Sequence, residues 1–213
     1  GIPEGWSAAQ FIDSWRSGGS DNQFLHMLEL GKPIIGAING WALGAGSWYA
    51  IYPHITIASE NAVFGQPEVR HGSNTNFIWT LLTGFKNSLR YGLVGDHIDA
   101  QEALRIGIVN KVVPHDQLLE ECFDIVERIS HVPPETVKIN LQVATRGLYM
   151  MGLRNALLLN NELKAMAHLS RSLDFFKPLD EAQRRGGLRE FLKLRDGPFQ
   201  PEPFGPRSKP RDS

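Results

Sequence analysis

The sequence predicts an α/β layer followed by a helical module. Residues 32–38 form a short apolar run that ends at Asn39-Gly40, and such a run is typical of a buried strand in a parallel sheet. A glycine-rich turn and a short helix at 47–51 should follow, and then a β-branched strand at 54–58. Strand, helix and strand in this order form a βαβ unit with parallel strands.

The remaining elements follow from apolar spacing, capping residues and glycine breaks. Ser7 and Asp99 are expected N-caps, and Thr83-Gly84-Phe85 should separate two short helices. In chain order we expect helices at 7–17, 22–30, 76–82, 86–94, 100–106, 115–129, 134–148, 153–172 and 179–194, with a brief strand at 109–113.

These elements divide the chain into three parts. Residues 1–130 are expected to form the α/β core, residues 131–199 a C-terminal helical module for oligomerisation, and residues 200–213 a polar, disordered tail. The first five residues, Gly-Ile-Pro-Glu-Gly, resemble the middle of a loop. We therefore expect native sequence, including further strands, to precede Gly1.

Composition argues against several classes of protein. The 22 basic and 23 acidic side chains give a formal charge of −1, so the sequence lacks the basic excess of a nucleic-acid binder. The apolar run near 32–41 is too short to span a bilayer. The single cysteine, Cys122, fits a core position and a reducing compartment. We expect a cytoplasmic protein with no nucleic-acid or membrane partner and, from its histidine spacing, no metal.

Two segments could carry chemistry together. Gly44 and Gly46 allow close approach of a ligand, and a helix that begins there directs free N–H groups outward. Glu68 follows Pro67 at a loop or strand end, where its carboxylate can meet the same site. A backbone anion hole with one carboxylate is what proton transfer beside a carbonyl requires.

These segments resemble the enoyl-CoA hydratase/isomerase (crotonase) family. The resemblance lies in the glycine-rich stretch at 32–46, in Phe-Gly-Gln-Pro-Glu at 64–68 and in the stretch at 95–113, and it covers about residues 32–199. It implies a crotonase fold of stacked ββα turns, with C-terminal helices that build homotrimers, often paired into homohexamers. It also implies an acyl-CoA substrate, with coenzyme A as part of the substrate and no permanently bound cofactor.

The family's site residues carry over to numbered positions here. The resemblance implies that the backbone N–H of Ala45 is one of two oxyanion donors, that Glu68 is the family's second catalytic glutamate, and that Gly44 and Gly46 contact substrate. The other oxyanion donor belongs to a loop just before the region where this chain begins.

One departure from the family pattern concerns Trp48. Hydratases of the family carry a glutamate two residues after the Gly-x-Gly, and this chain has Trp48 there. With Glu68 alone, plain hydration of an enoyl thioester is doubtful, whereas one carboxylate is sufficient to move a proton between carbons, as in enoyl-CoA isomerases. It could also serve a hydrolase, a lyase or a decarboxylase with help from another polar group. A catalytically lapsed binding or assembly protein is the alternative from another class.

Three nearby residues each have a structural and a functional interpretation. Trp48 could fill the core or line the substrate pocket. Asn76 could cap a helix or contact substrate. His71, three residues beyond Glu68, could be structural or could act on substrate. The functional interpretation places all three in the substrate-binding site.

Overall fold

The computed structural model describes residues 2–18, 21–169 and 174–203. Its first sheet has the order β1-β3-β6 and is entirely parallel. Strand β1 (Ile35–Ile38) pairs with β3 (Ile55–Ser59), and α3 (Ala45–Ile51) lies between them in the chain. Strand β6 (Lys111–Val113) joins the other edge of β3. The predicted βαβ unit is therefore confirmed.

A second small sheet was not predicted. It consists of β2 (Trp41–Leu43), β4 (Val63–Gly65) and β5 (Ile98–Asp99), where β4 pairs parallel to β2 and antiparallel to β5. Strands of two or three residues are too short for the alternation of side chains to reveal a period. This sheet positions the candidate site, because β2 leads into α3 and β4 leads into the next helical turn.

Helices form most of the remaining structure. Gly84, with φ 75° and ψ 164°, interrupts α4 with a kink, so the two helices expected on either side of it are present as the two halves of α4. Asp99 caps α5 as predicted, since its Oδ1 accepts a hydrogen bond of 2.8 Å from the N–H of Glu102. The helices are α1 (Ala8–Gly18), α2 (Asp21–Glu29), α4 (Phe77–Gly92), α5 (Ala100–Arg105), α6 (Leu118–Ser130), α7 (Pro134–Met150), α8 (Leu153–Leu169) and α9 (Lys177–Asp196), with 3-10 turns η1 (Pro67–His71), η2 (His115–Gln117), η4 (Asp174–Phe176) and η5 (Gly197–Phe199).

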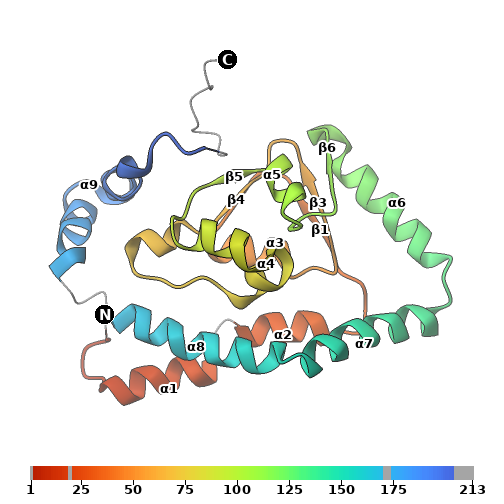
Figure 1. Ribbon diagram of the computed structural model, residues 1–213, viewed down its shortest axis with the longest axis horizontal. Coiled ribbons are helices and arrows are strands. Elements are labelled where there is room, and N and C mark those ends of the chain that lie inside the picture. The colour runs from red at the N-terminus through yellow and green to blue at the C-terminus, as the bar shows by residue number, and fades with distance from the viewer. Residues whose placement is uncertain (1, 19–20, 170–173, 204–213) are drawn as a thin grey trace.

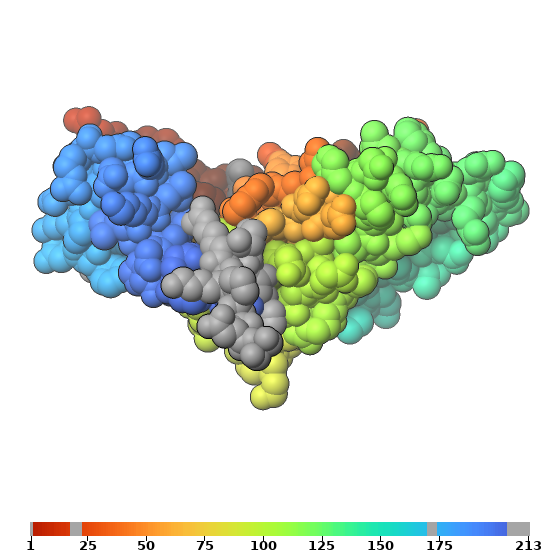
Figure 2. All heavy atoms as spheres, turned by 90° about the horizontal axis from the view of Figure 1, so that it is seen from above, coloured from red at the N-terminus to blue at the C-terminus, as the bar shows by residue number. Residues whose placement is uncertain are grey.

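The helices surround the sheets unevenly. Figure 1 shows α8 running along the base of the molecule beside α1 and α2, with the strands above it. Helices α6 and α9 lie at opposite ends, and Figure 2 shows the same separation from a perpendicular direction. The C-terminal helical module is thus present.

Two clusters of buried side chains hold these layers together. The larger cluster joins α2, α3, α4 and α8, and it includes the fully buried side chains of Phe24, Trp79 and Leu157. The smaller cluster packs α6 against the first sheet through Ile57, Cys122 and their neighbours. Cys122 is therefore a core residue, as expected.

The predicted disordered tail needs correction at its start. Residues 200–203 are described, and Glu202 is fully buried against the core. A polar composition suggested a solvated tail, but buried basic partners hold this carboxylate in place. Residues 204–213, and residues 170–172 of the helix expected at 153–172, lie outside the described residues.

Candidate active site

The turn at Gly44 fixes the start of α3. Gly44 has φ 57°, a conformation that glycine adopts without steric cost. Its N–H donates to the carbonyl of Gly65 in β4 at 3.0 Å, and its own carbonyl accepts from the N–H and hydroxyl of Ser47 at 3.0 and 2.7 Å. Ala45 is then the first helical residue and is exposed, and the N–H of a first helical residue has no acceptor within its own helix.

Glu68 lies directly over this turn. It is the second residue of η1, which begins at Pro67 immediately after β4 and Gln66. A Cβ atom built on Gly44 would lie 3.3 Å from Oε2 of Glu68, so the carboxylate and the turn are in contact. A Cβ on Gly46 would meet nothing within 4 Å, which leaves open space beside the helix start. The predicted pairing of a glycine turn with one carboxylate is present in the structure.

The Glu68 carboxylate is buried, and burial has the largest effect on its pKa. Both of its oxygens are shielded from solvent, and neither has a hydrogen-bond partner in the part of the chain that the structure describes. Burial raises the pKa of Glu68 to about 7, although its own backbone N–H and the charges of Arg195 and Lys164 act in the opposite direction. A carboxyl with this pKa can both accept and donate a proton near neutrality.

Trp48 and Lys164 form the neighbouring wall. The indole of Trp48 is 6% exposed, belongs to the larger core cluster and packs edge-on against Phe24. The ammonium of Lys164, which is 1% exposed, lies 3.9 Å from the centre of the Trp48 ring. A desolvated cation over an indole face is a favourable pair. The core interpretation of Trp48 is therefore supported, and its contact with substrate stays a prediction.

Asn76 and His71 have structural contacts. Asn76 is fully buried, and its Oδ1 accepts from the N–H of Ile78 at 3.0 Å and from the hydroxyl of Tyr52 at 3.1 Å. These contacts support the N-cap interpretation, and the contact of Asn76 with substrate stays a prediction. His71 is half-buried, with its ring edge-on to Phe191 at 5.5 Å.

Two cations near Glu68 were not assigned to the site from sequence. Lys164 lies on the buried face of α8, two turns after Leu157 and one turn after Asn160, which are also buried. Polar residues at spacings of three and four within an apolar stripe were the available signal. Arg195 comes from α9, far along the chain, and no local pattern connects it with Glu68.

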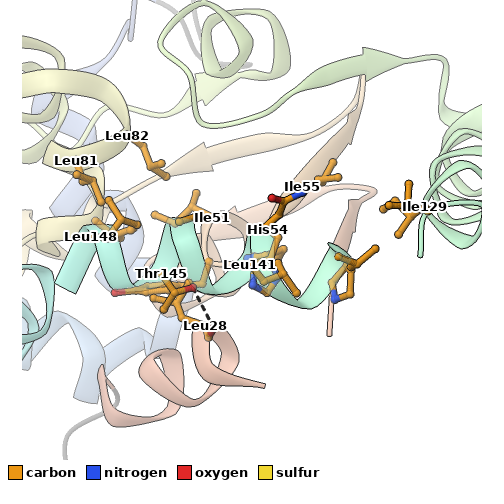
Figure 3. Close-up of a pocket in the computed structure, with 18 residues that line it drawn as sticks. Leu28, Ile51, His54, Ile55, Leu81, Leu82, Ile129, Leu141, Thr145 and Leu148 are labelled. Atoms are coloured by element: carbon orange, nitrogen blue, oxygen red, sulfur yellow. Dashed lines mark hydrogen bonds between the residues drawn. The ribbon is translucent and has the colours of Figure 1, made fainter. Parts of the chain in front are cut away.

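A separate apolar cavity lies away from this site. It has a volume of about 480 Å³ and is bounded by α7 on one side and by β3 and α4 on the other. Figure 3 shows Leu141, Thr145 and Leu148 facing Ile51 and His54 across it. Glu68 and the Gly44 turn do not line this cavity, so it is not the candidate active site.

Two kinds of feature are absent from the described residues. Their histidines, cysteines and acidic side chains include no cluster of three or more that could hold a metal ion. None of the helices in the same residues has the length and apolar character needed to cross a membrane.

The fold and site together define an α/β protein with a glycine turn at the start of a helix and one buried carboxylate beside it. The family model described as enoyl-CoA hydratase/isomerase matches residues 10–200. The chain belongs to this family.

Several curated relatives are similar to a large part of the chain. The short-chain-enoyl-CoA hydratase of Clostridium acetobutylicum is 39% identical over 142 residues, which is 64% of this chain and 54% of that protein. The 2,3-dehydroadipyl-CoA hydratase of Escherichia coli is 32% identical over 174 residues, which is 79% of this chain and 63% of that protein. The chain spans about half the length of the curated relatives it matches.

Solved structures show the same fold. An enoyl-CoA hydratase/isomerase from Xanthobacter autotrophicus superposes with a TM-score of 0.80 at 29% identity, covering 88% of this chain and 71% of that one. An enoyl-CoA hydratase from Mycobacterium smegmatis gives a TM-score of 0.83 at 20% identity, over 98% of this chain and 70% of that one. The predicted crotonase-like fold is confirmed.

Proposed function

We propose that the protein acts on an acyl-CoA thioester and that Glu68 transfers protons to and from the acyl carbons. The observation that carries this proposal is the buried, unpartnered carboxylate of Glu68 in contact with the Gly44 turn. A carboxylate left without hydrogen bonds costs free energy, so its retention favours a role in chemistry. The names of the relatives point to the same class of substrate.

The geometry supports a thioester enolate as the intermediate. In the proposed reaction the Glu68 carboxylate accepts a proton from the carbon next to the thioester carbonyl. The electron pair of that C–H bond moves into a C=C bond, and the carbonyl π pair moves onto oxygen. The N–H of Ala45 donates to this oxyanion. Glu68 then returns the proton to carbon, at a second position if the product is an isomer.

A single carboxylate favours proton shuttling over hydration. Hydratases of the family also use a first glutamate, at the position of Trp48, and this indole packs in the core under Lys164. Water activation at that position is lost, while proton transfer between carbons still needs only Glu68. We propose the isomerase-type reaction first, with a thioester hydrolase or lyase as the alternatives.

The test is turnover of a panel of acyl-CoA thioesters by the full protein and by Glu68→Gln. The amide keeps the size of the side chain but cannot exchange a proton at neutral pH. We expect kcat to fall roughly 10²–10⁴-fold while the Kd for acyl-CoA is nearly unchanged. We also expect crotonyl-CoA to be a poor hydration substrate of the unmodified protein.

Two results would contradict the proposal in different ways. Near-normal turnover by Glu68→Gln would show that Glu68 is structural. Binding of acyl-CoA without turnover across the whole panel would instead support a catalytically lapsed member of the family.

We further propose that the protein assembles as a homotrimer or homohexamer. Large apolar side chains on the outer faces of α6, α7 and α8 are exposed, among them Phe123, Val143 and Met166 at 67%, 68% and 61%. Faces of this kind on neighbouring helices are typical of an interface between subunits. Sedimentation at micromolar concentration should show the trimer or hexamer, and a stable monomer would contradict it.

A further inference from the structure

A buried ionic cluster lies behind the candidate active site, around Arg70. This residue is in the same 3-10 turn as Glu68, two positions further on, and its side chain is 1% exposed. Its guanidinium contacts the carboxylates of Asp96 at 3.0 Å, Asp196 at 3.1 Å and Glu202 at 3.0 Å. A planar guanidinium can bind several acceptors in fixed directions, so these contacts fix the orientation of the Arg70 side chain.

The surrounding chain closes tightly on the Arg70 side chain. Its Nε donates to the carbonyl of Val94 at 2.9 Å, and its guanidinium carbon lies 4.0 Å from the centre of the Phe199 ring. Gly95 has φ 75°, and a Cβ atom there would lie 2.9 Å from Val69 and 3.1 Å from Nε of Arg70. The turn can approach η1 this closely only with glycine at position 95.

The charges of the cluster are balanced. Arg90 contacts Asp96 at 2.8 Å, and Arg195 contacts Asp196 at 2.7 Å. Three arginines therefore face three carboxylates. His97 adds a hydrogen-bonding contact of 2.6 Å between Nδ1 and Glu202. A buried group of ions is tolerated when its charges are paired and hydrogen-bonded in this way.

Two of the three carboxylates come from one segment at the C-terminal end of the described chain. Residues 195–202, which we call the C-terminal arm, comprise the end of α9, the turn η5 and the stretch to Glu202. Asp196 is separated from Arg70 by 126 positions in sequence. The same arm carries Arg195, whose charge acts on Glu68 and opposes the effect of burial on its pKa. The arm thus reaches the candidate active site in two ways.

We infer that the C-terminal arm positions the proton-transfer glutamate. Asp196 and Glu202 hold η1 in place through Arg70, and Arg195 sets the charge next to the Glu68 carboxylate. These are positioning residues, because they act through η1 and through Glu68 and not on the reacting atoms. The inference rests on the proposed function of Glu68.

The main test compares Arg195→Met with Arg195→Lys, using the pH dependence of kcat in the full protein. Titration of Glu68 should give one limb of the plot of kcat against pH, and this limb is identified because it is absent from the plot for Glu68→Gln. Loss of a neighbouring cation raises the pKa of a carboxyl, so this limb should move to higher pH in Arg195→Met. Arg195→Lys retains the charge, and its limb should stay near that of the unmodified protein.

A second test uses Asp196→Asn and Glu202→Gln to determine whether these two carboxylates keep η1 in position through Arg70. A small displacement of a catalytic group can cost up to about 10²-fold in rate, so we expect kcat to fall roughly ten- to a hundredfold, with the Kd for acyl-CoA retained. Glu121→Gln is the matched control, since it removes a carboxylate from the more exposed ion pair with Lys111 and should leave kcat unchanged. Thermal unfolding confirms that each variant compared is folded.

The outcomes separate the inference from the proposed function. Normal activity of Glu68→Gln would remove the proposed function itself. If Glu68→Gln is inactive but the Glu68 limb does not move in Arg195→Met, the electrostatic role of the arm is wrong. If folded Asp196→Asn and Glu202→Gln keep the kcat of the unmodified protein, the positioning role through Arg70 is wrong. Should either of these two fail to fold, the Arg195 pair alone decides whether the arm acts on Glu68.

Discussion

Glu68 and Arg70 lie two residues apart on one 3-10 turn, and the surroundings of their charged groups are opposite in kind. Arg70 is surrounded by three carboxylates, a backbone carbonyl and an aromatic ring. The Glu68 carboxylate has no hydrogen-bond partner among the described residues. Both side chains are withdrawn from solvent, so burial alone does not distinguish them. The difference shows that one buried charge is neutralised by several partners, while the other has none of these hydrogen bonds, which is the arrangement that the proposed proton transfer by Glu68 requires.

The two regions should respond to pH in opposite directions. Burial raises the pKa of Glu68 above its ordinary 4.5, so the stability that its protonated form contributes is complete below pH 4.5 and is lost as the pH rises to about 7. For Asp196 and Glu202, burial alone would raise the pKa. Hydrogen bonds from Arg195 to Asp196, from His97 to Glu202 and from Arg70 to both nevertheless hold the pKa of each below its ordinary value. Their contribution is present above the ordinary pKa and is lost as the pH falls.

The largest expected effect on stability is from Arg70→Met. This change leaves Asp96, Asp196 and Glu202 buried with one cation fewer, and breaking such a group typically costs about 3–5 kcal/mol. Urea unfolding at pH 7 should show this loss in the free energy of unfolding. Glu121→Gln, at the more exposed pair with Lys111, should cost less than about 1 kcal/mol. Equal effects of the two changes would mean that the Arg70 cluster contributes no more than a surface ion pair.

A smaller effect of opposite sign is expected from Glu68→Gln. The shift in the pKa of Glu68 from 4.5 to about 7 corresponds to about 3 kcal/mol at about 1.4 kcal/mol per unit. The free energy of unfolding of Glu68→Gln should therefore exceed that of the unmodified protein by an amount that grows as the pH rises from 4.5 and reaches up to about 3 kcal/mol by pH 8. Urea unfolding at several pH values measures the difference. A difference that stays constant with pH would indicate that the carboxylate of Glu68 is not destabilised by burial.

Sequence patterns predicted the parts of the site that are local in the chain. Glycines at 44 and 46 and a carboxylate after Pro67 were recognised from their immediate neighbours in the sequence. The pairing of β2 with β4, which brings the turn and the carboxylate together, belongs to the second sheet and was not predicted. The kink at Gly84 and the cap at Asp99 were predicted because each depends on the residue itself and its immediate neighbours.

The parts that could not be predicted depend on contacts between distant segments. Glu202 lies in a Pro-rich polar stretch whose composition is typical of disorder, and only its pairing with Arg70 and His97 explains its burial. Lys164 interrupts an apolar helical stripe, and its partner Trp48 is 116 positions away. The short strands of the second sheet gave no signal because two or three residues do not establish a period.

The most direct test of the account is the pKa of the Glu68 side chain in the folded protein. It can be measured by following the side-chain carboxyl carbons of glutamate-labelled protein by NMR as a function of pH, with Glu68→Gln to assign the resonance. A carboxylate that is buried and left uncompensated for proton transfer should titrate with a pKa of about 7. Titration at or below the ordinary 4.5 would show that Glu68 is solvated or paired in solution, and the contrast with Arg70 on which the account depends would be wrong.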